Sequence, residues 1–325
     1  MSQAYRYNPI PKNDCGSTWC IVLAGGEGER MQPLIQSWLN ERRPKQFCAF
    51  TGTRSMLDHT LDRLHEISPP RRVVTVIGPR HLRYLQHNRG GDQRTRILQQ
   101  PEARGTGLGV YTALACIMRN DPESTILLLP SDHFMYPEQR FGQEALRAVG
   151  IDRRNPDKLV LVGARPQFPE PEYGWIEPGA RKHGSGSASV RRVESFREKP
   201  SAAKAERFYR LGWLCNTMIV AAQARALWTA GVKAQPKMLR RLSAIARWSP
   251  GPLALRALRA TYGETESVDF SRDILQKCTA MSLACPLRGM EWNDWGRPER
   301  IERSLASIGK RPNFHRNLAL AQPGP

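Results

Sequence analysis

The chain has 325 residues, 40% of them hydrophobic and 24% charged, and its formal net charge is +19 at pH 7. This composition is typical of a globular protein, and no apolar run approaches the roughly 20 residues that a membrane helix needs, so we expect no membrane partner. Residues 1–18 contain no apolar segment of the kind that signal peptides carry, which indicates a cytoplasmic protein.

The excess of positive charge has two interpretations. It could form a surface for nucleic acid, or it could steer polyanionic phosphate substrates toward the protein. The basic residues are scattered in pairs, such as Arg71-Arg72 and Arg240-Arg241, without a basic arm or an aromatic-rich nucleic-acid motif. We therefore expect no nucleic-acid partner. The seven cysteines include no Cys-x-x-Cys pair, which argues against a disulfide framework and structural zinc.

In chain order, the first half alternates between buried strands and helices. Continuous apolar runs predict strands over residues 19–24, 73–77, 126–129 and 159–163. Helical spacing of apolar residues predicts helices over residues 55–67 and 108–118. This alternation favours an α/β fold with a mixed, mostly parallel sheet flanked by helices.

The second half has shorter elements and a turn at residues 185–187. Its patterns predict strands over 173–177, 190–196, 216–222 and 281–286, and helices over 202–211, 223–231 and 236–248. We expect residues 1–18 to be an N-terminal extension, residues 19–305 to form one domain, and residues 306–325 to be an irregular tail.

A glycine-rich segment, Gly25-Gly26-Glu27-Gly28-Glu29-Arg30, directly follows the first strand. Its glycines allow the backbone to approach a phosphate closely, and Arg30 adds a donor suited to phosphate oxygens. The segment matches neither the ATPase P-loop nor the dinucleotide fingerprint. A phosphate-binding loop and a plain strand-to-helix turn both remain open from this segment alone.

Two further segments carry charged residues that suit phosphate chemistry. Lys45 follows the stiffening Pro44 and could direct its charge at the same phosphates, although a solvated charge run is the simpler interpretation. Ser131-Asp132 follows the strand over 126–129. Parallel sheets bind ligands at the carboxyl ends of their strands, where both the glycine-rich segment and Ser131-Asp132 fall.

Together with later motifs, these segments resemble the sugar-phosphate nucleotidyltransferases, and most closely the mannose-1-phosphate guanylyltransferases. The motifs occur in the family's order from residue 19 to about residue 303. Beyond the glycine-rich segment, they are Pro101-Glu102-Ala103-Arg104-Gly105-Thr106, Leu129-Pro130-Ser131-Asp132-His133, Arg165–Pro169 with Tyr173–Glu177, Phe196-Arg197-Glu198-Lys199-Pro200, Cys215-Asn216-Thr217-Met218 and Trp292-Asn293-Asp294-Trp295-Gly296.

The resemblance implies a Rossmann-like nucleotidyltransferase fold, with a nucleotide-binding half over 19–165 and a sugar-phosphate-binding half over 166–305. It implies that the phosphate of a sugar 1-phosphate attacks the α-phosphorus of a nucleoside triphosphate and releases pyrophosphate. GTP and mannose 1-phosphate, giving GDP-mannose, are the first expectation, and a homodimer is compatible with it. Another base or sugar, as in glucose-1-phosphate uridylyl-, adenylyl- or thymidylyltransferases, and a non-catalytic sugar-nucleotide binder remain alternatives.

The resemblance also implies roles for individual residues. The nucleotide-binding set is Leu23, Ala24, Gly25, Gly26, Gly28, Arg30, Lys45, Glu102, Gly105, Thr106, Ser131 and Asp132. The sugar-phosphate-binding set is Gly174, Glu198, Lys199 and Asn216. The catalytic set is Arg30, Lys45, Asp132 and Asp294, of which Asp132 and Asp294 would hold Mg²⁺, a cation that favours carboxylate oxygens.

Each assignment has a simpler alternative. Asp132 could cap a helix, Asp294 could stabilise a turn, and Glu198-Lys199 could be an exposed pair. The chain also departs from the family pattern, for example in a longer segment between Leu34 and Pro44, and two further departures concern the nucleotide. Glu29 stands where a small hydroxyl residue is usual, beside the expected triphosphate. The segment 104–108 lacks the usual Ala-Pro after its threonine, which puts base recognition in question.

Overall fold

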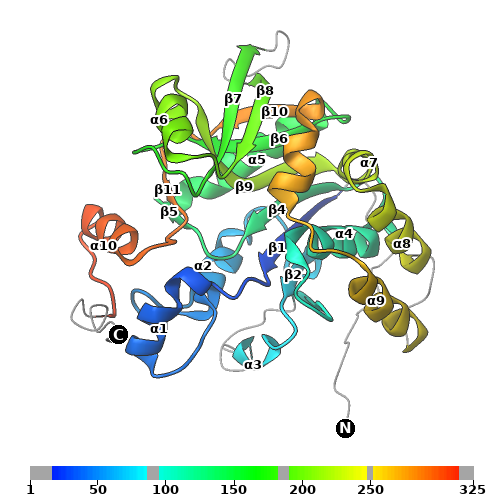
Figure 1. Ribbon diagram of the computed structural model, residues 1–325, viewed down its shortest axis with the longest axis horizontal. Helices are drawn as coiled ribbons and strands as arrows, with labels where there is room; N and C mark the ends of the chain where they lie inside the picture. Colours follow the sequence, from blue (N-terminus) through cyan, green and yellow to red (C-terminus); the bar gives the residue numbers. More distant parts are fainter. Residues whose placement is uncertain (1–16, 86–94, 182–189, 247–251, 315–325) are drawn as a thin grey trace.

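The computed structural model describes residues 17–85, 95–181, 190–246 and 252–314. A nine-stranded sheet crosses the centre of the molecule, and helices cover both of its faces (Figure 1). The expected turn at 185–187, most of the N-terminal extension and the end of the tail lie outside the described residues. No helix in the described part of the chain is both long and apolar enough to cross a membrane.

The strands of the molecule are β1 (Thr18–Ala24), β2 (Val73–Ile77), β3 (Arg96–Gln99), β4 (Thr125–Pro130), β5 (Phe134–Tyr136), β6 (Leu159–Ala164), β7 (Gly174–Arg181), β8 (Arg191–Glu198), β9 (Leu214–Gln223), β10 (Ser282–Pro286) and β11 (Glu291–Asn293). The helices are α1 (Gln32–Leu39), α2 (Met56–Arg63), α3 (Leu82–Leu85), α4 (Gly105–Met118), α5 (Gln139–Arg153), α6 (Ala202–Arg210), α7 (Ala224–Ala234), α8 (Pro236–Ala246), α9 (Pro252–Glu264) and α10 (Pro298–Ser307).

The large sheet has the order β3-β2-β1-β4-β9-β6-β10-β8-β7. β1, β2, β3 and β4 pair in parallel, as do β6 and β10. β9 runs antiparallel to its neighbours β4, β6 and β7, and β8 runs antiparallel to β7 and β10. Only β8 and β9 therefore oppose the other strands of this sheet, which confirms the predicted mixed, mostly parallel α/β fold.

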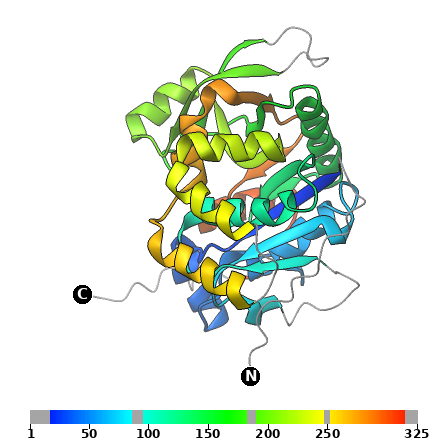
Figure 2. The ribbon, with the colours of Figure 1, turned by 90° about the vertical axis from the view of Figure 1, so that its right-hand side faces the viewer.

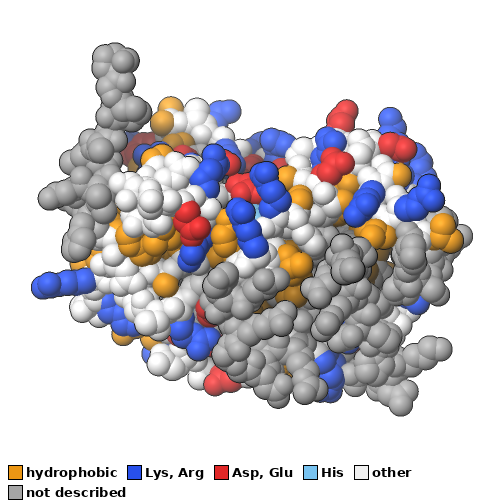
Figure 3. Space-filling view, turned by 90° about the horizontal axis from the view of Figure 1, so that it is seen from below, with side chains coloured by type: hydrophobic (Ala, Val, Ile, Leu, Met, Phe, Trp, Pro, Cys, Tyr) orange, Lys and Arg blue, Asp and Glu red, His pale blue; other side chains and the backbone are white. Residues whose placement is uncertain are grey.

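Alternation along the strands divides the core between the two faces of the sheet. In β1, Trp19 and Ile21 pack with α4 and α7, whereas Cys20 and Val22 pack with α2 and α5. Figure 2 shows α7, α8 and α9 together on one side of the sheet. On the face shown in Figure 3, basic side chains lie among acidic and hydrophobic ones instead of forming one continuous patch.

A third cluster of buried residues lies beside the sheet and includes the start of the predicted tail. α10 continues to Ser307, and Phe314 packs against Trp38 and Phe50. The side chain of Asn313 donates to two carbonyl oxygens of residues 49–52, each at 2.7 Å. α10 therefore extends two residues into the predicted tail, and residues 308–314 form no helix or strand but are held in place by apolar burial.

Most predicted strands are present with ends shifted by one or two residues. The predicted helix over 108–118 begins earlier, at Gly105, and the helix predicted over 55–67 ends at Arg63. The patterns did not predict the strands β3, β5 and β11 or the helices α1, α3, α5, α9 and α10. Cys15 is outside the described residues, and the six described cysteines are free, which agrees with the expected lack of disulfides.

Candidate active site

The glycine loop, residues 25–30, leaves the carboxyl end of β1 and is fixed by two glutamine side chains. The amide of Gln46 donates to the carbonyl oxygens of Ala24 (2.8 Å) and Gly26 (2.9 Å). The amide of Gln32 donates to a carbonyl oxygen in the middle of the loop (2.8 Å). Because Gln46 and Gln32 are buried, these bonds fix the path of the loop with little competition from water.

We expect Gln46→Leu to loosen the loop. The variant keeps a similar volume but leaves the carbonyl oxygens of the buried Ala24 and of Gly26 without their donor, so the free energy of unfolding should fall by about 1–3 kcal/mol. The KM for the nucleotide should rise about tenfold, since small displacements of positioning groups are costly. Denaturant unfolding and steady-state kinetics measure both. Gln143→Leu, at an exposed position of α5, is the control; equal effects in the two variants would contradict this role.

Lys45 lies directly against the glycine loop. Gly28 has a φ of 65°, in the left-handed region that favours glycine, and a Cβ at this position would lie 3.0 Å from the Cβ of Lys45. Lys45 begins a short 3₁₀ turn, η2 (Lys45–Phe47), after the extended Pro44. The structure therefore brings together two segments that the sequence keeps apart.

The ammonium group of Lys45 joins the two predicted acids. Its Nζ forms an ion pair with Oδ2 of Asp132 at 2.8 Å and donates to the backbone carbonyl oxygen of Asp294. Asp132 follows β4 and Asp294 follows β11, and the pairing of Asn293 with Phe134 between β11 and β5 places the two acids side by side. Burial alone would raise the pKa of Asp132, but Lys45 outweighs it and the pKa is lowered.

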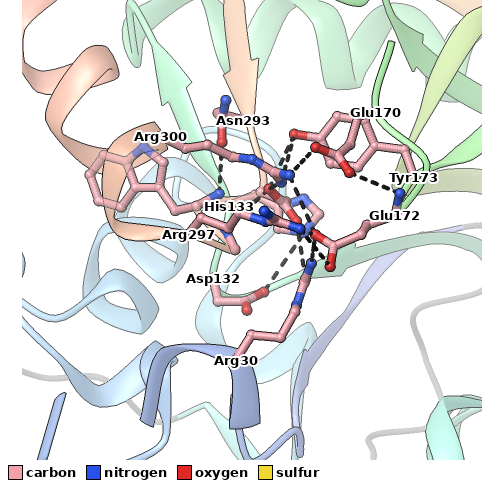
Figure 4. Close-up of polar contacts among 12 residues, drawn as sticks. Arg30, Asp132, His133, Glu170, Glu172, Tyr173, Asn293, Arg297 and Arg300 are labelled. Atoms are coloured by element: carbon pink, nitrogen blue, oxygen red, sulfur yellow. Dashed lines mark hydrogen bonds and ion pairs between the residues drawn. The ribbon is translucent and has the colours of Figure 1, made fainter. Parts of the chain in front are cut away.

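The carboxylate of Asp294 accepts several hydrogen bonds, and Figure 4 labels three of its partners, Arg30, Tyr173 and Arg300. Its Oδ1 accepts from Arg300 at 2.6 Å and from the hydroxyl of Tyr173 at 3.1 Å. Its Oδ2 accepts from Arg30 at 3.2 Å. Burial disfavours the charged form, yet Lys45 and Arg300 outweigh it and hold the pKa of Asp294 far below its ordinary value. The carboxylate is therefore ionised throughout the physiological range.

Arginine–glutamate pairs surround Asp294. Arg300, whose side chain is 6% exposed, also pairs with the buried Glu170. Arg30 pairs with Glu172 at 2.5 Å, and Arg297 contacts the same carboxylate at 3.3 Å. Arg30 is half exposed, at 48%, whereas Arg300 is enclosed. Arg300 is thus a structural anchor of Asp294, and Arg30 can leave its acidic partners for another anion.

Glu29, the unexpected acid of the glycine loop, faces a cation. Its carboxylate accepts from Nη2 of Arg42 at 2.9 and 3.1 Å. Both side chains are mostly exposed, at 68% and 59%. A neighbouring guanidinium and solvent thus offset part of the negative charge of Glu29.

The predicted sugar-binding residues gather at the ends of β7, β8 and β9. A Cβ on Gly174 would lie 2.5 Å from Oε2 of Glu198 and 3.2 Å from Cβ of Asn216, so only glycine leaves this space open. Between β6 and β9 the pairing jumps from Val162↔Ile219 to Gly163↔Asn216. The bulge re-aims Asn216, and its amide donates to the hydroxyl of Ser271 at 3.2 Å.

Glu198 carries an unused acceptor. Its Oε2 is buried and has no hydrogen-bond partner among the described residues. Burial, aided by the nearby Asp269, raises the pKa of Glu198 to about 7. A buried acceptor without a donor is costly, and sugar hydroxyl groups would supply the missing donors. Lys199 is exposed, and its backbone N–H donates to the carbonyl oxygen of Tyr173 at 3.1 Å.

The predicted base-side residues contact a different segment. The hydroxyl of Thr106 accepts from the backbone N–H of Phe270 at 2.8 Å, and Gly105 lies against Val268 with a φ of 77°. Glu102 forms an exposed ion pair with Arg104. These contacts fix the start of α4. They are made with residues 267–270 and within the segment itself, instead of with Lys45 and the two acids.

Ser131 and His133 flank Asp132 and have structural partners. The hydroxyl of Ser131 donates to the carbonyl oxygen of Leu23 at 2.7 Å, which ties β4 to β1. Nε1 of Trp292 donates to Nδ1 of His133 at 3.1 Å, so this nitrogen is an acceptor. Burial lowers the pKa of His133 to about 4. His133 is therefore a neutral, packed histidine near Asp132.

A divalent cation fits the two acids only together with substrate. Within the described residues, no group of three or more His, Cys, Asp and Glu side chains could hold a metal ion. Mg²⁺, however, is usually bound by one or two carboxylates plus substrate phosphates. Asp132 is 29% exposed with one cationic partner, and Asp294 adds a second oxygen donor once Arg30 moves away. The donor set therefore suits Mg²⁺ delivered with a phosphate.

Sequence reasoning missed several residues that build the site. Gln32, Gln46, Glu170, Glu172 and Arg300 hold the loop or Asp294. Their partners are distant in the sequence: Arg300 and Glu170, for example, are 130 residues apart. The one local signal was the arginine on the otherwise apolar face of α10, where Ile301 and Leu305 are buried.

Comparisons with known proteins identify the family of the chain. The model of the nucleotidyl transferase family matches residues 19–310. The xanthan biosynthesis protein XanB of Xanthomonas campestris pv. campestris (strain B100) is 34% identical over 195 residues, which cover 59% of this chain and 39% of that protein. A mannose-1-phosphate guanylyltransferase of Escherichia coli is 30% identical over 199 residues, 58% of this chain and 40% of that protein. The chain thus matches less than half the length of these curated relatives.

Solved structures share the fold. A mannose-1-phosphate geranyltransferase from Thermus thermophilus superposes with a TM-score of 0.74 at 26% identity and covers 88% of this chain and 78% of that one. A glucose-1-phosphate thymidylyltransferase described for Bacillus anthracis superposes with a TM-score of 0.56 at 16% identity, covering 93% of this chain and 99% of that chain, which supports the fold alone.

Proposed function

Because this chain belongs to the nucleotidyl transferase family, we propose that it transfers a nucleotidyl group from a nucleoside triphosphate to a sugar 1-phosphate. The observation that carries the proposal is the contact of Lys45 with both Asp132 and Asp294, beside the glycine loop. A second support is the link between the two groups of residues. Tyr173 donates a hydrogen bond to Asp294, and the next residue, Gly174, lies against the Glu198 oxygen that has no hydrogen-bond partner among the described residues. In this proposal, the phosphate and sugar groups would bind at adjacent positions.

The proposed substrates are GTP and mannose 1-phosphate, giving GDP-mannose and pyrophosphate. The mannose-1-phosphate guanylyltransferase relative at 30% identity supports this choice. The unusual segment after Thr106 leaves other bases and sugars as the alternative, because base choice depends on a few loop contacts. The reaction class is independent of that choice.

In the proposed reaction, a phosphate oxygen of the sugar 1-phosphate attacks the α-phosphorus as the bond to the leaving pyrophosphate breaks. The nucleophile is already ionised, so the protein mainly positions two anions in line and neutralises the developing charge. The glycine loop and a released Arg30 bind the triphosphate, and Lys45 stabilises charge on the transferred and leaving phosphates. Glu198 accepts from sugar hydroxyls, and Lys199 binds the sugar phosphate.

We further propose that Asp132 and Asp294 hold Mg²⁺ when the nucleotide is bound. The metal would neutralise phosphate charge and polarise the phosphorus–oxygen bonds. The support is the adjacent pair of carboxylates, of which Asp132 is partly exposed. Arg300 keeps the Asp294 carboxylate oriented while Arg30 transfers to the phosphates.

A substrate panel tests the proposal. The purified chain is incubated with GTP, ATP, UTP or dTTP and with mannose or glucose 1-phosphate, with and without Mg²⁺, and pyrophosphate release is measured. The highest turnover is expected with GTP, mannose 1-phosphate and Mg²⁺. Turnover with another pair alone would overturn the substrate assignment, and binding without turnover by any pair would favour a non-catalytic binder.

Glu198 provides a pH-dependent test of the sugar site. Its carboxyl is protonated below about pH 7 and charged above it, so affinity for the sugar phosphate should rise with pH through this range. Glu198→Gln should raise the KM for the sugar phosphate about tenfold, as expected when a charged hydrogen-bond acceptor is lost. When the KM of the variant is plotted against pH, the change near pH 7 should be absent. Only the change caused by protonation of the substrate phosphate, at about pH 6, should remain.

The matched control is Glu194→Gln, an exposed residue of the same strand β8. It should leave the KM profile of the wild type unchanged. If the KM of Glu198→Gln still changed near pH 7 as in the wild type, the assignment of Glu198 to the sugar site would be wrong.

A further inference from the structure

A cavity of about 210 Å³ lies next to the catalytic groups but is not formed by them. Its walls come from the loop after η2, from α2, β5 and the start of α5, and from the end of α10. None of Arg30, Lys45, Asp132 or Asp294 lines it, whereas His133 does. The lining residues that matter here are Phe50, Arg63, Phe134, Glu138, Trp295 and Lys310.

Two donors in this wall have no acceptor. The Nε of Arg63 and the Nε1 of Trp295 are buried and unpartnered within the described part of the chain. The Nη2 of Arg63 donates only to uncharged oxygens, the hydroxyl of Thr60 at 2.9 Å and the carbonyl of His133 at 3.4 Å. Among the described residues, no carboxylate forms an ion pair with this guanidinium. Glu138 and Asp62 favour its charged form without forming an ion pair with it. An enclosed cation without a close counter-ion is unfavourable, so an acceptor-rich anion would be stabilised at this wall.

The other charges of the wall leave a positive surplus. Glu138 is its one carboxylate and pairs with His59 at 3.3 Å. Burial alone would raise the pKa of Glu138, but His59, Arg63 and Lys310 together lower it. Arg54 is engaged by Asp62 at 2.7 Å outside the wall. One carboxylate is thus shared among several cations, which leaves room for a second anion.

Aromatic rings form the remaining wall and limit what can bind. Phe134 stacks on Trp295 with centroids 4.9 Å apart, and Phe50 meets Trp295 edge to face at 6.0 Å. Sites for drug-sized ligands occupy about 300–1,000 Å³, so this cavity is too small for a whole nucleotide. A phosphate with a small apolar or ring substituent matches both the size and the two kinds of wall.

We propose that this cavity is a second ligand site, distinct from the catalytic centre, which binds a small phosphate monoester through Arg63, Trp295 and Lys310. The phosphate oxygens take up the unpartnered donors, and the substituent lies against the aromatic rings. The site touches the backbone of His133, which follows the catalytic Asp132, through the bond from Arg63.

Calorimetric titration with phenyl phosphate tests this site. Wild-type protein and Lys45→Ala, whose catalytic phosphate position is impaired, should both bind the probe at this site with equal affinity. Arg63→Met should raise the dissociation constant about tenfold or more, because a charged hydrogen bond is lost. Inorganic phosphate should bind more weakly than phenyl phosphate; equal affinities would contradict the aromatic contact.

Lys310→Gln keeps the test decisive if Arg63→Met does not fold, since Lys310 is exposed. It should weaken phenyl phosphate binding several-fold, while Lys277→Gln, an exposed lysine elsewhere on the chain, should not. The proposal would be wrong if Lys45→Ala abolished binding of phenyl phosphate. It would also be wrong if both Arg63→Met and Lys310→Gln bound the probe like the wild type, and the cavity would then be a solvent-filled pocket.

Discussion

Replacing Lys45 by methionine should lower kcat by about 10²–10³-fold, the loss typical of removing one preorganised charge-stabilising donor. Among the described residues, Lys45 is the one side chain that touches both acids and the glycine loop. Methionine keeps the length and the packing of the stem against Gly28 but removes the charge. The KM values should change much less than kcat, because the charge of Lys45 matters most where charge develops on the leaving pyrophosphate.

Pre-steady-state and steady-state pyrophosphate release measure this effect. Lys204→Met, at an exposed position of α6, is the matched control and should turn over like the wild type. Far-ultraviolet circular dichroism and denaturant unfolding check that Lys45→Met is folded. A folded Lys45→Met enzyme with wild-type kcat would show that Lys45 only anchors the acids, and the proposed role would be wrong.

The sheet could be predicted because its central strands are continuous apolar runs. β1, β2, β4 and β6 are buried on both faces, and such strands need no partner information to be recognised. The sequence pattern did not predict β3 because this edge strand has only four residues, with arginine and glutamine at its ends. α5 was not predicted because it has few large apolar residues: small residues such as Ala145 and Ala148 form part of its buried face, and polar residues make up much of the rest of the helix.

The candidate site was predictable only where it follows strand ends. Gly25 to Arg30 and Asp132 lie where a parallel sheet binds ligands, and the structure puts both beside Lys45. The network around Asp294 was not predictable, because Arg300 and Glu170 meet across 130 residues and neither stands in a local pattern. In the structure, Arg30 pairs with Glu172 and with Asp294. These two contacts likewise arise from tertiary packing and could not be predicted from the sequence.

Alanine substitution of the two acids should separate chemistry from stability. Both Asp132→Ala and Asp294→Ala should lower kcat by about 10²-fold or more, since each removes a proposed Mg²⁺ ligand. Their unfolding free energies should differ. Asp132 is 29% exposed with one cationic partner, so its loss should cost about 1 kcal/mol, near the value for a solvated pair.

Asp294→Ala should cost on the order of 3 kcal/mol, as removal of one member of a buried ion pair does. Its carboxylate is 11% exposed and accepts from Arg300, Arg30 and Tyr173. Arg300 keeps Glu170, which holds the cost near the lower end of that range. Asp294→Asn should recover part of the stability, because the amide oxygen still accepts from Arg300, but little of the turnover. Equal free energies of unfolding for Asp132→Ala and Asp294→Ala in urea would mean that the arginine network does not depend on Asp294. An Asp294→Asn enzyme with wild-type turnover would show that the charge of Asp294 is not needed for catalysis.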